Sequence, residues 1–213
     1  MRAALDAHAA IRHDTQSFPE SEIVKRLGVP HGSAEGLFFP DTYYFANGTS
    51  DVAILQRAYR AMQAQLDPLW NSRAGGLPLQ NPYQALILAS IIEKETGQPG
   101  ERAMIAAVFV NRLKLGMRLQ TDPTVIYGLG EQFDGDLRKR DLLADGLYNT
   151  YTREGLPPTP IAMPGADSLT AALNPAPSKA LYFVARGDGT SHFSATLAEH
   201  ERAVTKYQKR GKR

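Results

Sequence analysis

The chain has 213 residues, of which 43% are hydrophobic and 22% charged, and this composition excludes a disordered chain and a fibrous protein. The net charge is only +2 and five of the last eight residues are basic, so we do not expect a nucleic-acid surface spread over one face. The absence of cysteine excludes disulfides, thiol nucleophiles and thiolate metal sites.

Membrane-spanning and export segments are not apparent. The most apolar stretch, residues 85–92, is far shorter than the ~18 residues that cross a bilayer. The first residues lack the apolar core of a signal peptide. We therefore expect any membrane anchor to lie outside this sequence.

The first third of the chain is predicted to hold three helices. Two short ones precede Gly28, and the second, over residues 20–27, begins after Ser17 and Pro19 and ends at Gly28 and Pro30. Residues 31–48 form a loop rich in glycine and aromatic residues. A long helix over 51–70 follows, capped by Ser50, and its apolar residues keep helical spacing: Val52, Leu55, Tyr59, Met62 and Leu66.

A helical hairpin is predicted in the middle of the chain, over residues 82–96 and 99–115, with Gly97 between the helices. Each helix opens with a proline near its first turn, where the missing N–H group costs nothing. Apolar residues occupy nearly every side of both helices, so we expect this hairpin to be the buried centre.

The C-terminal part is predicted to be mixed. Residues 116–152 are expected to be irregular, and the proline-rich stretch 157–177 to be a surface loop with a short helix at 168–173. Residues 180–186 and 191–195 are typical of a β-hairpin, since Asp188-Gly189 supplies a tight turn. A helix over 197–210 closes the chain, and its basic tail complements the helix dipole. The fold class is therefore α+β: mainly helical, with a buried helical hairpin and a small antiparallel β-hairpin.

Two acids near the end of the first central helix are candidates for catalysis. Glu95 shares a helix face with Leu88, Ile91 and Ile92, whereas Glu93 lies on a face of smaller, partly polar residues. Burial against aliphatic side chains raises the pKa of a carboxylic acid. An acid that stays protonated near neutral pH is what general-acid cleavage of an acetal requires. We therefore single out Glu95; the alternative is an ordinary solvated acid at a helix end.

Two polar clusters are candidates for binding. Residues 117–124 bring amide, hydroxyl, carboxylate and guanidinium groups into a turn after the apolar hairpin, where binding groups concentrate. Alternatively, Asp122 caps a helix that Pro123 begins. Residues 148–151 mix aromatic rings with amide and hydroxyl groups, which suits sugars, or form a turn with two packed tyrosines. The five histidines lack the spacing of a zinc site, so no metal or other cofactor is expected.

Several blocks between residues 35 and 207 occur in an order that points to one family. They are EG at 35–36, FPDT at 39–42, ASIIEKET at 89–96, VFVNRL at 108–113, residues 116–128, YNTY at 148–151, GLPP at 155–158, PGADSL at 164–169 and LYFVA at 181–185. In these blocks the chain resembles the YceG-like family of endolytic murein transglycosylases.

The resemblance implies lytic cleavage of peptidoglycan glycan strands between N-acetylmuramic acid and N-acetylglucosamine, forming 1,6-anhydro-muramic acid ends. It places the family's catalytic glutamate, the second acid of its Glu-Lys-Glu motif, on Glu95. Residues of the matching blocks that we expect to hold sugars, with Glu35 or Asp41 as a possible second carboxylate, are Glu35, Asp41, Asn111, Arg112, Gln120, Asp122, Asn149 and Tyr151.

The resemblance also implies a cellular setting. The family carries an N-terminal membrane helix and a LysM-like subdomain, so residues 1–30 are expected to be a helical connection and residues 31–213 the catalytic domain. The expected place of action is the periplasmic face of the bacterial inner membrane, where cleavage limits nascent strands beside penicillin-binding peptidoglycan synthases.

Two other hypotheses remain open. One is a non-catalytic peptidoglycan-binding module that uses the aromatic loop from Phe38 to Phe45 as a sugar platform. The other, disfavoured by the near-neutral charge of the rest of the chain, is a nucleic-acid binder that uses the basic tail.

Overall fold

The computed structural model describes residues 2–29 and 33–209. Its N-terminal part holds the two predicted short helices, α1 (Arg2–Asp6) and α2 (Glu20–Arg26). A parallel pair of two-residue strands, β1 (Ile11–Arg12) and β2 (Thr49–Ser50), was not predicted, because strands this short show no alternation pattern. Between them the predicted loop is confirmed over residues 33–48; His31 lies outside the described residues.

Helix α3 (Asp51–Asn71) links the N-terminal part to the core. It begins where predicted, with the Ser50 hydroxyl accepting a hydrogen bond from the Val52 amide at 3.2 Å. Its first half contributes Leu55 to an apolar cluster with α2, and its second half contributes Met62 to the main core. One helix thus joins two apolar clusters.

The main core surrounds the predicted helical hairpin. Helix α4 (Pro82–Glu95) is buried continuously over residues 85–92, and α5 (Arg102–Lys114) follows a 3₁₀ turn at Pro99–Glu101. Both pack against α8 (Ala166–Leu173), the predicted short helix, which starts two residues earlier than expected. A fully buried Leu or Ile side chain contributes about 1.5–3 kcal/mol, and α4 alone buries several. The prediction of a buried helical centre is confirmed.

The segment predicted to be irregular contains two helices, α6 (Asp122–Leu129) and α7 (Lys139–Leu143), with a 3₁₀ turn at Gly130–Gln132. The main expectation was therefore wrong for residues 122–129 and 139–143, and the alternative of a helix beginning near Pro123 is confirmed. The N-cap of α6 is Thr121, however, and Asp122 is already helical. Eight residues are too few for the apolar period to be evident in the sequence.

The chain ends with the predicted hairpin and helix. Strands β3 (Tyr182–Ala185) and β4 (Ser191–Ser194) pair antiparallel, and the turn between them uses positive φ at Gly187 and Gly189. Helix α9 (Leu197–Val204), which continues as a π turn over Thr205–Lys209, packs against both strands. Its predicted last residue, Arg210, lies outside the described residues. The α+β class is confirmed.

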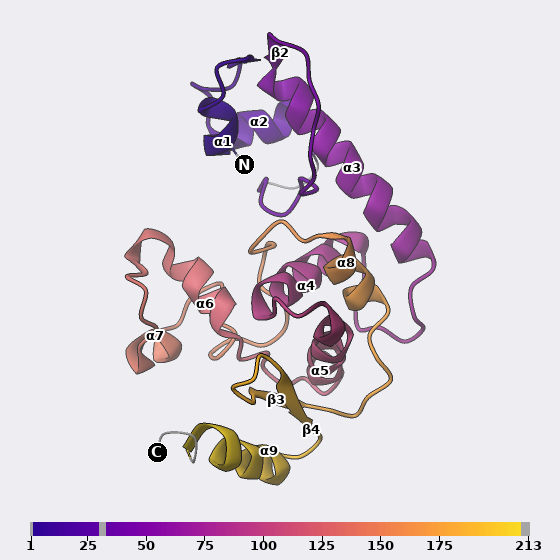
Figure 1. Cartoon of the computed structure of the whole chain (residues 1–213), viewed down its shortest axis with the longest axis vertical. Helices are drawn as coiled ribbons and strands as arrows, with labels where there is room; N and C mark the ends of the chain where they lie inside the picture. The colour runs from indigo at the N-terminus through magenta and orange to yellow at the C-terminus, as the bar shows by residue number, and fades with distance from the viewer. Residues whose placement is uncertain (1, 30–32, 210–213) are drawn as a thin grey trace.

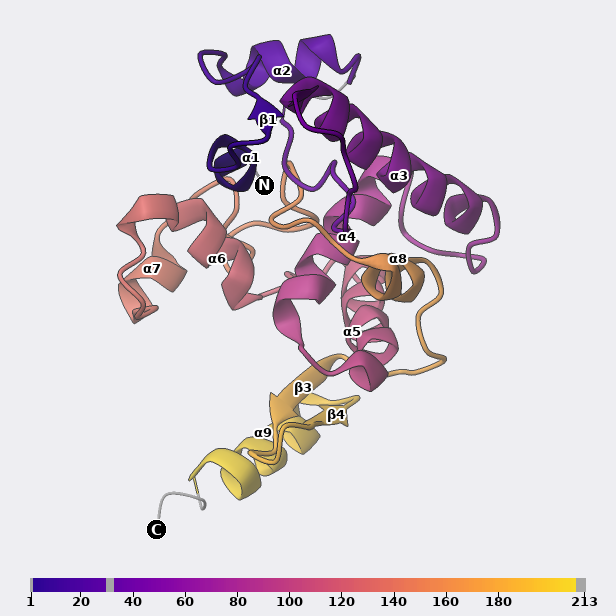
Figure 2. The ribbon, with the colours of Figure 1, turned by 45° about the horizontal axis from the view of Figure 1, so that its top comes forward.

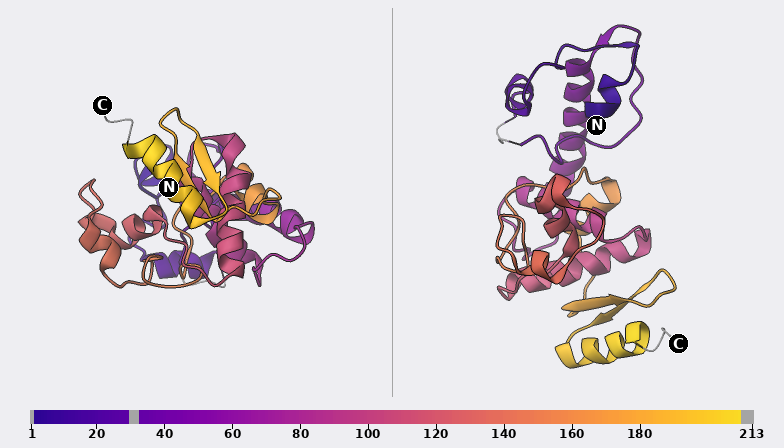
Figure 3. Two further views of the ribbon diagram at one scale, coloured as in Figure 1. Left: turned by 90° about the horizontal axis from the view of Figure 1, so that it is seen from below. Right: turned by 90° about the vertical axis from the view of Figure 1, so that its left-hand side faces the viewer.

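These parts follow one another along the long axis of the molecule (Figure 1). The N-terminal helices lie at one end, α4, α5 and α8 in the middle, and the hairpin with α9 at the other end, as three tiers (Figure 3, right). Helices α6 and α7 lie to one side of the middle tier, opposite the second half of α3 (Figure 2). None of the described helices is long and apolar enough to cross a bilayer.

Candidate active site

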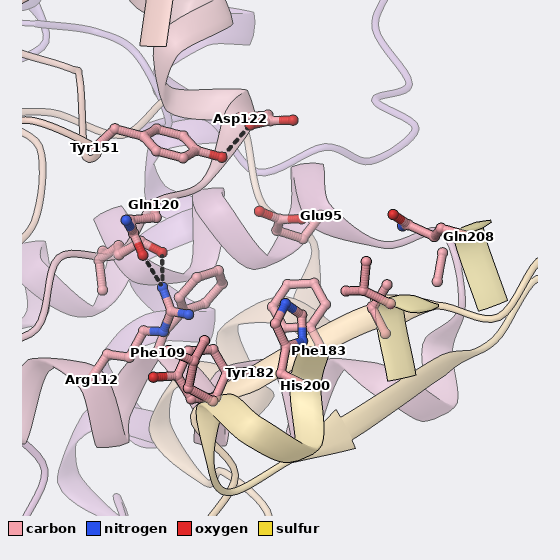
Figure 4. Close-up of a pocket in the computed structure, with 15 residues that line it drawn as sticks. Glu95, Phe109, Arg112, Gln120, Asp122, Tyr151, Tyr182, Phe183, His200 and Gln208 are labelled. Atoms are coloured by element: carbon pink, nitrogen blue, oxygen red, sulfur yellow. Dashed lines mark hydrogen bonds between the residues drawn. The ribbon is translucent and has the colours of Figure 1, made fainter. Parts of the chain in front are cut away.

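A cavity of about 520 Å³ lies where the middle tier meets the hairpin and α9. Figure 4 shows Glu95 near its centre, with Tyr151 and Asp122 on one side and Tyr182, Phe183 and His200 on the other. Elements far apart in the sequence supply its lining: Glu95, Phe109, Arg112, Leu119, Gln120, Asp122, Tyr151, Tyr182, Phe183, Val184, Ala185, Leu197, His200, Val204 and Gln208.

Glu95 is the last residue of α4 and is half-buried. Burial raises the pKa of its carboxyl above the ordinary value, and the negative charge of Asp122 adds to this. A hydrogen bond from the Thr121 hydroxyl to Oε1 and the positive charge of Arg112 act on the pKa in the opposite direction. The sequence argument for a shielded acid is thus supported, with the cavity's aromatic side chains adding to the shield.

Glu93 has a different environment. Its Oε2 accepts hydrogen bonds from the Gly165 amide at 3.0 Å and the Ser168 hydroxyl at 2.7 Å. Gly165 is the N-cap of α8, so this carboxylate binds one backbone donor at the start of that helix, where a negative charge is favourable. Arg102 lies 3.9 Å from its other oxygen. Glu93 therefore joins α4 to α8 and does not line the cavity.

Arg112 and Gln120 form one wall of the cavity. The buried Arg112 guanidinium donates to the carbonyl oxygens of Leu181 at 2.7 Å and Leu119 at 2.8 Å, and to Gln120 Oε1 at 3.4 Å. Burial lowers the pKa of Arg112, but an arginine stays charged in proteins. Because its Nε and Nη1 donors are engaged by the protein, Arg112 fixes the wall, and it supplies positive charge near the acid without an ion pair between these two described residues.

Asp122 and Tyr151 lie on the opposite side of Glu95 from the hairpin (Figure 4). The Tyr151 hydroxyl donates to Asp122 Oδ1 at 2.5 Å. Burial raises the pKa of Tyr151, and its bond to Asp122 raises it further, so the phenol stays neutral. Asp122 is therefore a second carboxylate in the cavity, held by a neutral donor.

Asn111 and Asn149, both predicted to hold sugars, do not line this cavity. The Asn111 amide donates to the carbonyl oxygens of Ser178 and Ala180, which anchors the segment before β3 to α5. The buried Asn149 amide donates to three carbonyls at the end of α7, and its oxygen accepts from the Tyr151 amide at 2.8 Å. The amide nitrogens of both residues donate to backbone carbonyls, so the two asparagines hold neighbouring segments in place.

Glu35 and Asp41, the predicted second carboxylates, also lie outside the cavity. Glu35 lines a separate cavity of about 270 Å³ with Tyr127, and burial raises its pKa. Asp41 is exposed and accepts from the Thr42 amide at 2.7 Å. The carboxylate that the structure does bring to Glu95 is Asp122.

The aromatic floor of the cavity was missing from the predicted site. His200 of α9 stacks on Tyr182 of β3, with ring centroids 5.2 Å apart, and burial lowers the pKa of the imidazole, which favours its neutral form. Phe183 packs edge-on against Phe109 of α5. A signal was present: Leu197, His200 and Val204 share one face of a helix, and residues 182–185 fall in a family-matching block.

Aromatic residues of the loop proposed as a sugar platform pack against the rest of the protein. Phe38 is buried in the cluster with α2, and the Tyr43 hydroxyl donates to the Phe39 carbonyl at 2.7 Å. Tyr44 is 85% exposed. Of the aromatic residues from Phe38 to Phe45, Tyr44 is the one that is exposed, which weakens the case for a sugar platform. Across residues 2–29 and 33–209, no group of three His, Asp or Glu side chains could hold a metal.

Comparisons with known proteins agree with the resemblance found in the sequence. An endolytic murein transglycosylase of Bacillus subtilis (strain 168) is 38% identical over 209 residues, 96% of this chain and 57% of the relative. One of Streptococcus pneumoniae serotype 2 is 30% identical, over 88% of this chain and 34% of the relative. The crystal structure of a YceG-like protein from Listeria monocytogenes gives a TM-score of 0.70 at 38% identity, over 88% of this chain and 61% of that one.

The chain therefore spans about half the length, or less, of the curated relatives it matches. The sequence model of the YceG-like family matches residues 2–206, a range that starts within the segment predicted to be a connection. With this match over nearly its whole length, the chain belongs to the YceG-like family.

Proposed function

We propose that this chain is the catalytic part of a lytic transglycosylase that cleaves peptidoglycan glycan strands endolytically, between N-acetylmuramic acid and N-acetylglucosamine. The observation that carries the proposal is Glu95, a carboxylic acid whose pKa is raised by burial, in a cavity lined by hydrogen-bonding groups and aromatic rings. The names of the relatives, endolytic murein transglycosylases, support the substrate and the reaction.

The reaction needs one acid that acts twice. Protonated Glu95 gives its proton to the glycosidic oxygen as the bond from that oxygen to C1 of the muramic acid breaks. The resulting carboxylate then takes the proton of the C6 hydroxyl of the same sugar, and O6 bonds to C1. This forms a 1,6-anhydro ring, consumes no water and returns Glu95 to its protonated form. The intramolecular attack has a high effective molarity.

The walls of the cavity suit this course. The carboxylate of Asp122 favours the protonated form of Glu95 before the proton is transferred, and it stabilises positive charge that develops at C1. Phe183 and the stacked pair of Tyr182 and His200 line the cavity with apolar surface that suits sugar rings. The engaged Arg112 keeps its positive charge in place without forming an ion pair that would hold Glu95 ionised.

The proposal extends to the cell. Cleavage of this kind limits or terminates the elongation of nascent strands, and we place it at the periplasmic face of the bacterial inner membrane, next to penicillin-binding peptidoglycan synthases. This part rests on the cellular setting that the sequence resemblance implies.

The test is the release of soluble fragments from purified sacculi by the wild-type chain and by Glu95→Gln. The amide has the size of the acid but no acidic proton, so release should fall by about 100-fold or more. Glu93→Gln is the matched control, because it lies on the same helix turn, makes its hydrogen bonds outside the cavity and should keep cleavage.

Wild-type release by Glu95→Gln would refute the proposal. Binding of sacculi without any release by the wild-type chain would favour the non-catalytic binding module instead.

A further inference from the structure

We propose that Thr121 is a positioning residue for Glu95, held in place by two further buried threonines, so that its hydroxyl occupies Oε1 and leaves Oε2 to carry the acidic proton. This inference rests on the proposed function for its catalytic meaning. Its structural basis is a hydrogen-bond network that neither the sequence nor the family comparison identified.

The network joins Thr121, Thr124 and Thr150, which are 2%, 0% and 3% exposed. The Thr124 hydroxyl donates to the Thr121 carbonyl at 2.8 Å and lies 2.9 Å from the Thr150 hydroxyl. The Thr150 hydroxyl accepts from the Thr121 amide at 3.1 Å. Both backbone polar groups of Thr121 are therefore clamped by side chains.

The proton count fixes the direction of each bond. A threonine hydroxyl has one proton to donate. The proton of Thr124 goes to the Thr121 carbonyl, so Thr150 must be the donor in the Thr124–Thr150 pair. The Thr121 hydroxyl takes no part in these bonds and is free to donate its own proton to Glu95 Oε1. The hydroxyls of Thr124 and Thr150 thus hold the backbone of Thr121, and the Thr121 side chain reaches the acid.

The backbone before Thr121 is strained in a way that serves this geometry. Among the described residues, Gln120 is the one non-glycine residue with a positive φ, at 50°. Its amide donates to the Thr150 carbonyl at 3.0 Å, which holds the unusual conformation. Leu119 and Thr121, on either side of this exposed residue, are both buried. Such strain persists only where the surroundings enforce it, and it clusters at functional sites.

The effect on the acid has two parts. Thr121 is the hydrogen-bond partner that the described part of the chain offers the Glu95 carboxyl. While its hydroxyl donates to Oε1, that oxygen is occupied as an acceptor and the acidic proton of Glu95 is carried on Oε2. Donation to the carboxyl also favours the ionised form and opposes the rise in pKa that burial causes. Thr121 thus sets both the geometry and the strength of the acid.

The experiment compares Thr121→Val, which keeps the shape and removes the donor, with Thr121→Ser, which keeps the donor. The pKa of Glu95 is measured directly by ¹³C NMR of the labelled glutamate carboxyls, with Glu95→Gln identifying the signal. We expect the valine variant to raise the pKa of Glu95 by about one pH unit, since one charge-assisted hydrogen bond is lost. The serine variant should stay near wild type, as should Thr170→Val, an exposed threonine on α8.

Glycan cleavage gives the second readout. A general acid must be protonated, so the rate falls as pH rises through its pKa. In Thr121→Val this alkaline limb should move up by about one pH unit, while kcat falls about tenfold, since an acid without its orienting bond transfers its proton less well. KM should stay near wild type, and serine should restore kcat. If Thr121 had a purely structural role, Thr121→Val would lower the melting temperature without changing the pKa of Glu95 or the pH at which the alkaline limb falls.

An unchanged pKa of Glu95 in Thr121→Val, or a serine variant that behaves like the valine variant, would overturn the inference. If Thr121→Val does not fold, Thr121→Ala gives the same titration. If the wild-type chain cleaves no glycan, the proposed function fails, but the NMR titration still decides whether Thr121 controls the acid.

Discussion

At the scale of single residues, the two acids of the Glu-Lys-Glu sequence show how far the sequence can be used. Their helix faces predicted that Glu95, and not Glu93, would be the shielded acid, and the raised pKa of Glu95 agrees. The partners of Glu93 could not be predicted, because Gly165 and Ser168 lie 72 and 75 positions further along the chain. Local periodicity predicts the helix face on which a side chain lies, but it does not predict which distant residues contact that face.

The same limit explains the two asparagines. An amide suits a sugar hydroxyl and a backbone carbonyl equally well, so residue type alone could not separate these roles. Asn111 and Asn149 both bind carbonyls of segments that approach from elsewhere. Conversely, the sequence indicates Thr121 only as a member of the polar turn over residues 117–124, and its contact with Glu95 follows the strained residue Gln120.

Glu95 also leads to a prediction about stability. Its pKa is raised in the folded state, so between the unfolded and folded pKa values the native state binds more protons than the unfolded state. The contribution of Glu95 to stability is therefore greatest below its unfolded pKa and is lost as pH rises through its folded pKa. Glu95→Gln, which never ionises, should be more stable than wild type at pH 8, and the difference should shrink at pH 4.

Urea unfolding of both proteins at these two pH values measures this difference. A wild-type chain that is as stable as Glu95→Gln at pH 8 would show that the acid is fully solvated.

At the scale of elements, the predictions succeeded where a pattern was long. The central hairpin and α3 have many apolar residues at helical spacing, and they were found with nearly correct ends. Irregular structure was the main expectation for helix α6, because its eight residues begin with Asp-Pro, which is equally typical of a turn. The hairpin was found because Asp-Gly marks its turn.

Arg112 ties these elements together, and its replacement tests how the cavity wall is built. It joins α5 to the segment before β3 and to the residues before α6. Lysine keeps the charge but lacks the planar fork, so Arg112→Lys leaves buried carbonyls without donors. We expect the free energy of unfolding to fall by about 2 kcal/mol, and cleavage to fall as well because the wall loosens.

Chemical denaturation and the sacculus assay check both effects. The exposed Arg140→Lys is the matched control and should change stability by less than about 0.5 kcal/mol. Equal stability of the two variants would mean that a lysine ammonium can replace the planar guanidinium of Arg112.

At the scale of the whole molecule, the site is a junction. The end of α4, Gln120 and Asp122 with Tyr151, and strand β3 with α9 come together around one carboxyl (Figure 4). The sequence predicted most of these pieces separately, but it could not predict that α9 would close the cavity, since that contact depends on how the hairpin is attached to α5 through Asn111 and Arg112. Tertiary attachment, more than local propensity, makes the site.

The central proposal is that Glu95 acts as acid and then as base within one turnover, with no water added to the cleaved strand. The most direct test is to digest glycan strands in water enriched in ¹⁸O and weigh the new muramic acid ends. We predict ends without ¹⁸O, lighter by one water than hydrolysis products and resistant to borohydride reduction. Reducing ends that contain one ¹⁸O atom would contradict the account and indicate hydrolysis with Asp122 as a second working carboxylate.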